Sequence, residues 1–129
     1  MPIVILVTAL LNPTYTVTQG TPTQVGSVQA IHVHISNDAD AISQAVTPQE
    51  WYFDPNTGLP LRVEYHVPDP LNALNWAPGA RDFANYQPVN GFLVPFQITN
   101  WVSGNSVSVT TISAVQLNIA VTESEFDLP

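Results

Sequence analysis

Residues 61–67 read Leu-Arg-Val-Glu-Tyr-His-Val, and apolar and polar side chains alternate through the whole stretch. Alternation with a period of two is typical of a strand that buries one face and exposes the other. The same period recurs at residues 28–35, whose apolar members include Ile31, Val33 and Ile35. The two stretches therefore predict a β-sheet with one apolar and one polar face.

Turn residues separate these stretches from further runs of the same kind. Residues 54–58, Asp-Pro-Asn-Thr-Gly, place proline and glycine where a turn needs them, and Asn90-Gly91 is the strongest short hairpin signal. The strands predicted between the turns cover residues 15–18, 28–35, 50–54, 61–67, 83–89, 92–101 and 106–118. We expect a mainly β fold of about seven strands, in one curved antiparallel sheet or incomplete barrel.

Prolines limit this predicted sheet. Residues 68–80 contain three of them, and because proline has no N–H to give to a neighbouring strand, we expect a loop there. Pro95 makes residues 92–101 an edge or bulged strand. Residues 41–46 are expected to form one helical turn, which Thr47-Pro48 ends.

The length predicts a single β domain over residues 1–129, with an apolar segment at 1–11, the sheet at 12–122 and an acidic tail at 123–129. The apolar segment is too short to span a bilayer, which takes about 20 helical residues. We interpret it either as a buried strand, because much of it is β-branched, or as the end of a helix from a longer parent chain. The fold should thus contain at most one short N-terminal helix, or a strand donated to another sheet.

The composition excludes some classes of partner. Of the 129 residues 9% are charged, and the formal net charge is −8. Lysine is absent, and the only arginines are Arg62 and Arg81. Nonspecific nucleic-acid binding and docking to an anionic membrane surface both need several cationic side chains. A chain without cysteine also has no disulfide framework and no thiolate nucleophile.

Several segments together resemble a known family. They are residues 51–62 (WYFDPNTGLPLR), 82–86 (DFANY), 89–96 (VNGFLVPF) and 115–118 (VQLN), with Phe126, and in the first half residues 12–17, Gly26 and residues 31–35. The combination resembles bacterial extracytoplasmic proteins of the lipoprotein-carrier family (LolA/LolB-like). The resemblance implies an unclosed barrel whose concave face holds acyl chains beneath a helical lid, in a periplasmic or extracellular location.

Aromatic side chains are the candidate binding residues for an apolar ligand or partner. They are Trp51, Phe53, Tyr65, Trp76, Phe92 and Phe96. If the apolar segment is instead a strand donated to another copy, the self-association residues are Ile3, Val4, Ile5, Leu6 and Val7.

Two histidines on one strand face, His32 and His34, would lie about 7 Å apart. If the strand that carries Glu64 and His66 is their neighbour, a metal site of these four side chains is geometrically possible. We expect instead that they are ordinary polar residues of a solvent-facing surface, with no metal and no other cofactor.

No catalytic residues are expected. Two carboxylate pairs, Asp38 with Asp40 and Glu123 with Glu125, fall in a predicted loop and in the tail, where they are solvated. Asp54 and Asp82 are expected to accept hydrogen bonds from turn backbone. The remaining charged candidates are a surface pair of Arg62 with Glu64, and an anion clamp formed by Arg81 beside Asp82.

Two functions remain open. The first is a non-catalytic module that binds an apolar, lipid-like ligand on the concave face of the sheet, which the resemblance favours. The second is a structural protein that self-assembles into an extracellular polymer or surface layer through strand addition and burial of its apolar face. The absence of lysine favours the second, because lysine commonly guards exposed strand edges.

Overall fold

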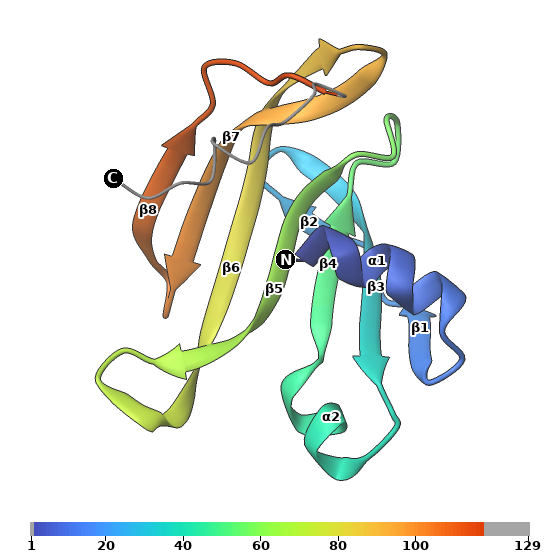
Figure 1. Cartoon of the computed structure of the whole chain (residues 1–129), viewed down its shortest axis with the longest axis vertical. Coiled ribbons are helices and arrows are strands. Elements are labelled where there is room, and N and C mark those ends of the chain that lie inside the picture. Colours follow the sequence, from blue (N-terminus) through green and yellow to red (C-terminus); the bar gives the residue numbers. More distant parts are fainter. Residues whose placement is uncertain (1, 118–129) are drawn as a thin grey trace, which may run out of the picture.

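The computed structural model describes residues 2–117. Within them a single sheet of eight antiparallel strands is accompanied by two short helices (Figure 1). In chain order the elements are α1 (Pro2–Leu11), β1 (Tyr15–Gln19), β2 (Thr23–Val25), β3 (Val28–Asn37), α2 (Ala41–Val46), β4 (Gln49–Phe53), β5 (Pro60–Asp69), β6 (Asn72–Val89), β7 (Phe92–Val102) and β8 (Asn105–Thr111). The expected mainly β fold is confirmed.

The sheet is an open meander. Its strand order is β1-β3-β4-β5-β6-β7-β8, and the short β2 also pairs with β3. From β3 onward, each strand pairs with the next one in the chain. The strands β1 and β8 are the two edges, so the sheet does not close into a barrel. Helix α1 crosses in front of β3 and β4 (Figure 1).

The register gathers the large apolar side chains on one face. Val33, Trp51 and Val63 lie opposite one another on three adjacent strands, and the side chains of Trp51 and Val63 are fully buried. The Trp51 ring stacks on Phe53 and Phe83, with centroids 5.9 and 6.3 Å away. Because burial of one large apolar side chain contributes about 1.5–3 kcal/mol, this cluster is the main stabilising feature of the sheet.

The N-terminal segment is helical, so its interpretation as a buried strand is wrong. Proline is well suited to the first turn of a helix, and Pro2 begins α1. The end is set by Asn12, whose N–H donates to the Thr8 carbonyl at 2.9 Å and whose side chain accepts from the Thr14 N–H at 3.0 Å. Packing on the sheet offsets the poor helix propensity of its β-branched residues, since Ala9 is buried in the core cluster. Within residues 2–117, no helix is long and apolar enough to cross a membrane.

The expectation of a loop at residues 68–80 is also wrong, because β5 and β6 continue through it as a long hairpin. The last β4–β5 pair is at Glu64 and the first β6–β7 pair is at Gly79. In the part of the hairpin that holds Pro68 and Pro78, β5 and β6 therefore pair only with each other. A proline there has no second strand on its other side to which a backbone N–H would have to be donated. The turn itself holds Pro70.

Other local predictions have different outcomes. Residues 41–46 form α2, and its N-cap Asp40 accepts hydrogen bonds from the Ile42 and Ser43 N–H groups at 2.9 and 2.8 Å. The last strand was expected to reach residue 118 but ends at Thr111. The acidic tail at 123–129 lies outside the described residues.

Candidate functional site

An apolar cavity lies between α1 and the sheet. It has a volume of about 300 Å³, and nearly all of its lining is hydrocarbon. The lining residues are Leu6, Ala9, Leu10, Val17, Val33, Ile35 and Phe53. Such a volume is at the lower end of the range for small-molecule sites, which is about 300–1,000 Å³.

The strand repeat of two residues and the helix spacing of three residues place the side chains that line this cavity. Val17 and Ile35 are paired across β1 and β3, and Val33 lies two residues before Ile35, on the same face. Leu6 and Ala9 are three residues apart in α1, so both point to one side of the helix. Leu10 also lines the cavity but is 77% exposed, which places it at the rim.

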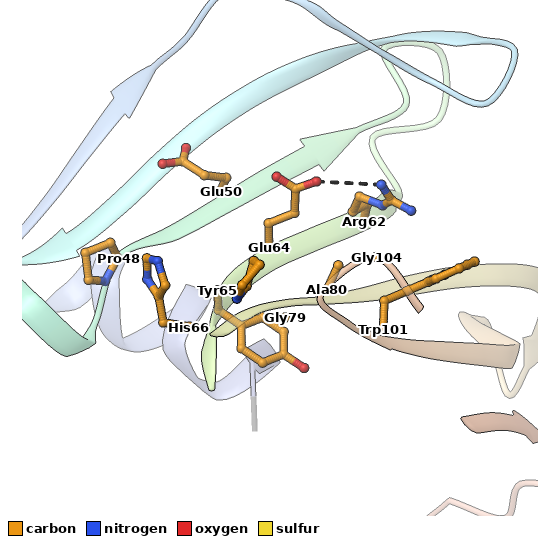
Figure 2. A pocket seen from close by; sticks show the side chains of 11 residues that line it. Pro48, Glu50, Arg62, Glu64, Tyr65, His66, Gly79, Ala80, Trp101 and Gly104 are labelled. Atoms are coloured by element: carbon orange, nitrogen blue, oxygen red, sulfur yellow. Dashed lines mark ion pairs between the residues drawn. The ribbon is translucent and has the colours of Figure 1, made fainter. Parts of the chain in front are cut away.

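A larger hollow opens over β4 to β7, mainly on the polar face of the sheet. Its volume is about 480 Å³. It is lined by Pro48, Glu50, Arg62, Glu64, Tyr65, His66, Pro78, Gly79, Ala80, Trp101 and Gly104. Figure 2 shows that Glu50, Glu64 and Arg62 rise on one side of β4 and β5, whereas the Tyr65 ring points to the other side.

A bidentate ion pair fixes one end of this hollow. Arg62 and Asp82 are cross-strand partners, and the guanidinium donates to both carboxylate oxygens at 2.6 and 2.9 Å. The indole N–H of Trp101 donates to the same carboxylate at 2.8 Å. The hydrogen bonds that Arg62 donates to Asp82 raise the pKa of the guanidinium above its ordinary value. The sequence signal that could have found this network is the alternation of 61–67, which puts Arg62 on the polar face.

Glu50 joins two histidines at the other end. Its carboxylate oxygens lie 2.6 Å from His32 Nε2 and 2.6 Å from His34 Nδ1. Next to it, the Tyr52 hydroxyl donates to Glu64 at 3.1 Å. Burial raises the pKa of Tyr52 to about 12, and the negative charges of Glu64 and Glu50 act in the same direction. Sequence reasoning missed Glu50, because only the pairing of β3 with β4 brings it to the histidines.

The four-residue metal site requires β3 and β5 to be neighbours, and β4 lies between them. His32 and His34 therefore meet Glu50, whereas Glu64 and His66 are one strand further away. Among residues 2–117 there is no group of three or more metal-ligating side chains arranged to hold an ion.

The aromatic candidates do not form one site. Trp51 lies in the core, Phe53 lines the apolar cavity, and Tyr65 lines the polar hollow. Phe96 is buried elsewhere on the sheet. The remaining two are at the ends of the long hairpins and largely exposed, Trp76 by 55% and Phe92 by 65%.

The other charged candidates divide as follows. Asp54 accepts the Asn56 N–H at 2.8 Å, as expected of a turn residue, but Asp82 lies inside β6 and binds side chains. Arg81 donates to Asn100 at 2.7 Å, so it forms no clamp with Asp82. Arg62 and Glu64 do form the expected pair, at 3.6 Å.

The self-association residues Ile3, Val4, Ile5, Leu6 and Val7 all lie in α1. Donation of this segment as a strand would require the helix to unfold. As folded, its backbone hydrogen bonds are made within the helix and are not offered to another sheet.

Comparison with known proteins gives a similarity of fold. No protein-family model and no curated protein matches the sequence. Among solved structures, an outer membrane lipoprotein-sorting protein domain from Vibrio parahaemolyticus superposes with a TM-score of 0.52 at 15% sequence identity. The match covers 81% of this chain and 45% of the other, so this chain spans less than half of that one. The resemblance seen in the sequence is thus confirmed at the level of the fold, which is similar to that of the matched part of this domain.

Proposed function

We propose that this protein is a non-catalytic, extracytoplasmic module that binds one apolar, lipid-like ligand between α1 and the sheet. The observation that carries the proposal is the cavity of about 300 Å³ lined by α1, β1, β3 and β4. An alkyl chain enclosed there gains about 0.8 kcal/mol for each CH₂ group removed from water. The shared fold with a lipoprotein-sorting domain supports both the ligand class and the location.

The experiment combines ligand identification with a substitution that fills the cavity. The protein is purified without detergent, extracted, and its extract analysed by mass spectrometry, while the apo form is titrated with a fluorescent fatty acid. Val17→Phe places a ring in the cavity and should weaken binding at least tenfold, about 1.4 kcal/mol. Val107→Phe, a matched change on the exposed strand β8, should leave binding unaltered. Equal binding by the two variants contradicts the proposal.

A second candidate function is self-assembly, and the edge strand β8 favours it. All seven residues of β8 are exposed, and they include Val107 and Val109 but neither a charge nor a proline. Such an unguarded edge can pair with a strand of another copy. Light scattering on the detergent-free sample distinguishes the two functions, because a lipid-free polymer supports assembly and a lipid-bearing monomer supports carriage.

A further inference from the structure

We propose that the apolar cavity between α1 and the sheet takes a single alkyl chain of about ten to twelve carbon atoms, whose uncharged headgroup stays outside at the mouth. This assignment rests on the proposed function. It narrows the ligand from lipid-like molecules in general to amphiphiles that have one chain of medium length and no acidic group.

The volume of the cavity limits the number of carbon atoms that it can hold. An enclosed apolar cavity of about 150 Å³ admits one benzene ring, which has six carbons. By proportion, the volume of about 300 Å³ between α1 and the sheet has room for about ten to twelve. A second chain of that length would need about twice the space, and a chain of about sixteen carbons would leave its last carbons in water.

The exposure of the lining residues indicates where the chain enters. Leu10 and Val17 are 77% and 43% exposed, so the mouth lies between the end of α1 and the edge strand β1. Ala9 and Ile35 are buried and form the inner part of the lining. The terminal methyl group of the ligand would therefore lie against Ile35, and its headgroup would lie near Leu10.

The lining offers no hydrogen-bonding partner to a polar headgroup. All the described residues that line the cavity have hydrocarbon side chains. The backbone of β3 is paired with β1 on one side and with β4 on the other. A headgroup drawn inside would lose its hydrogen bonds to water without replacement, which is unfavourable. The headgroup therefore remains in solvent while the alkyl chain is enclosed.

The charges of the chain disfavour an acidic headgroup. The formal net charge is −8 and lysine is absent, while Arg62 and Arg81 lie on β5 and β6, which contribute no residue to the described lining. His32 and His34 flank Val33 on β3, and because Val33 lines the cavity, the two histidines point to the opposite face. Within residues 2–117, no arginine or lysine is thus placed to pair with a carboxylate or phosphate at the mouth.

The test measures how the affinity for neutral amphiphiles depends on chain length. Alkyl maltosides with chains of about eight to sixteen carbons are titrated into the protein in a calorimeter, each below the concentration at which it forms micelles. The affinity should rise about fourfold for every added CH₂ group up to about twelve carbons and then level off. A rise that continues to the longest chain would show that the cavity sets no limit, and would overturn the proposal while leaving lipid binding intact.

A substitution at the mouth tests whether this cavity sets the limit. Val17→Ala removes two carbon atoms from the lining and should move the plateau to chains about two carbons longer. Val107→Ala, the matched change on the exposed strand β8, should leave the plateau unchanged. Should Val17→Ala fail to fold, Phe53→Leu enlarges the cavity from β4 and should extend the plateau by about three carbons. The same plateau in an enlarged cavity and in the wild type contradicts the proposal.

Dodecanoate, compared with dodecyl maltoside, tests the headgroup. Dodecanoate should bind more weakly at low ionic strength, because the net charge of −8 repels its carboxylate. Added salt should narrow the difference, since it screens this repulsion. Tighter binding of dodecanoate than of the maltoside would overturn the assignment of an uncharged headgroup. If neither the maltosides nor dodecanoate bind, the proposed function itself is wrong, so the two failures are distinguishable.

Discussion

The two faces of the sheet are built from the same strands but are stabilised in different ways. On the face that carries α1, the side chains of Trp51 and Val63 are fully buried, and the indole N–H of Trp51 donates to the Gln49 side chain at 2.9 Å. On the other face, Glu50, Arg62 and their neighbours remain partly exposed and satisfy one another by hydrogen bonds. Apolar burial is thus concentrated on the first face, whereas on the second face charged groups pair with one another.

The largest expected effect is on the apolar face. Trp51→Ala should lower the free energy of unfolding by about 3–5 kcal/mol, because it removes the ring on which Phe53 and Phe83 stack. Trp76→Ala, the same change at a side chain 55% exposed, should cost far less. Urea denaturation measures both. Similar losses in the two variants would show that the stability of the sheet is not concentrated around Trp51.

A smaller effect is expected on the polar face. Arg62→Met removes both hydrogen bonds to Asp82 and should cost about 1–3 kcal/mol, because among the described residues that carboxylate then keeps the Trp101 N–H as its hydrogen-bond donor. Arg81→Met breaks a hydrogen bond to the neutral Asn100 and is the matched control, with a smaller expected loss. An effect of Arg62→Met as large as that of Trp51→Ala would reverse the ranking of the two faces.

Alkaline pH should act on both faces at once. Burial raises the pKa values of Tyr52 and Tyr86 to about 12, from 10.0. Since the folded state holds these protons more tightly than the unfolded chain, their stabilising contribution is complete below pH 10 and is lost as the pH rises towards 12. Denaturation midpoints should therefore fall over that range. The decline should be shallower in Tyr86→Phe, and an identical decline would rule out this residue as a cause.

The smallest effect should be confined to α2. Asp40→Ala removes the side chain that accepts from the Ile42 and Ser43 N–H groups. Hydrogen exchange at these two amides should accelerate, while the global midpoint stays close to that of wild type, because no residue of α2 is buried. A large fall of the global midpoint would mean that α2 supports the sheet.

The sequence predicts most of the fold because its decisive signals are local. Alternation at 61–67 and turn residues such as Asn90-Gly91 act over a few neighbours, and β5 and the β6–β7 turn follow from them. The hairpin through residues 68–80 was missed because the proline rule depends on whether a second strand lies alongside. Whether a second strand pairs at these prolines depends on the tertiary structure, which the local sequence does not show.

The candidate site is less predictable, since it depends on which strands become neighbours. The side chains of His32 and His34 could be assigned to one face, but their partner Glu50 follows only from the register of β3 with β4. Trp51 and Phe53 are equally aromatic in the sequence. Trp51 lies in the core between Val33 and Val63 of the neighbouring strands, whereas Phe53 is the last residue of β4 and lines the cavity.

The order of elements along the chain has a consequence for biosynthesis. During translation α1 emerges before every strand on which it rests, and a decapeptide helix is marginal in water by itself. The helix therefore cannot pack on the sheet until β3 and β4 have been synthesised, roughly forty residues later. Until then the apolar segment 2–11 has no sheet to pack on, so it is exposed to water or to other chains for that part of synthesis.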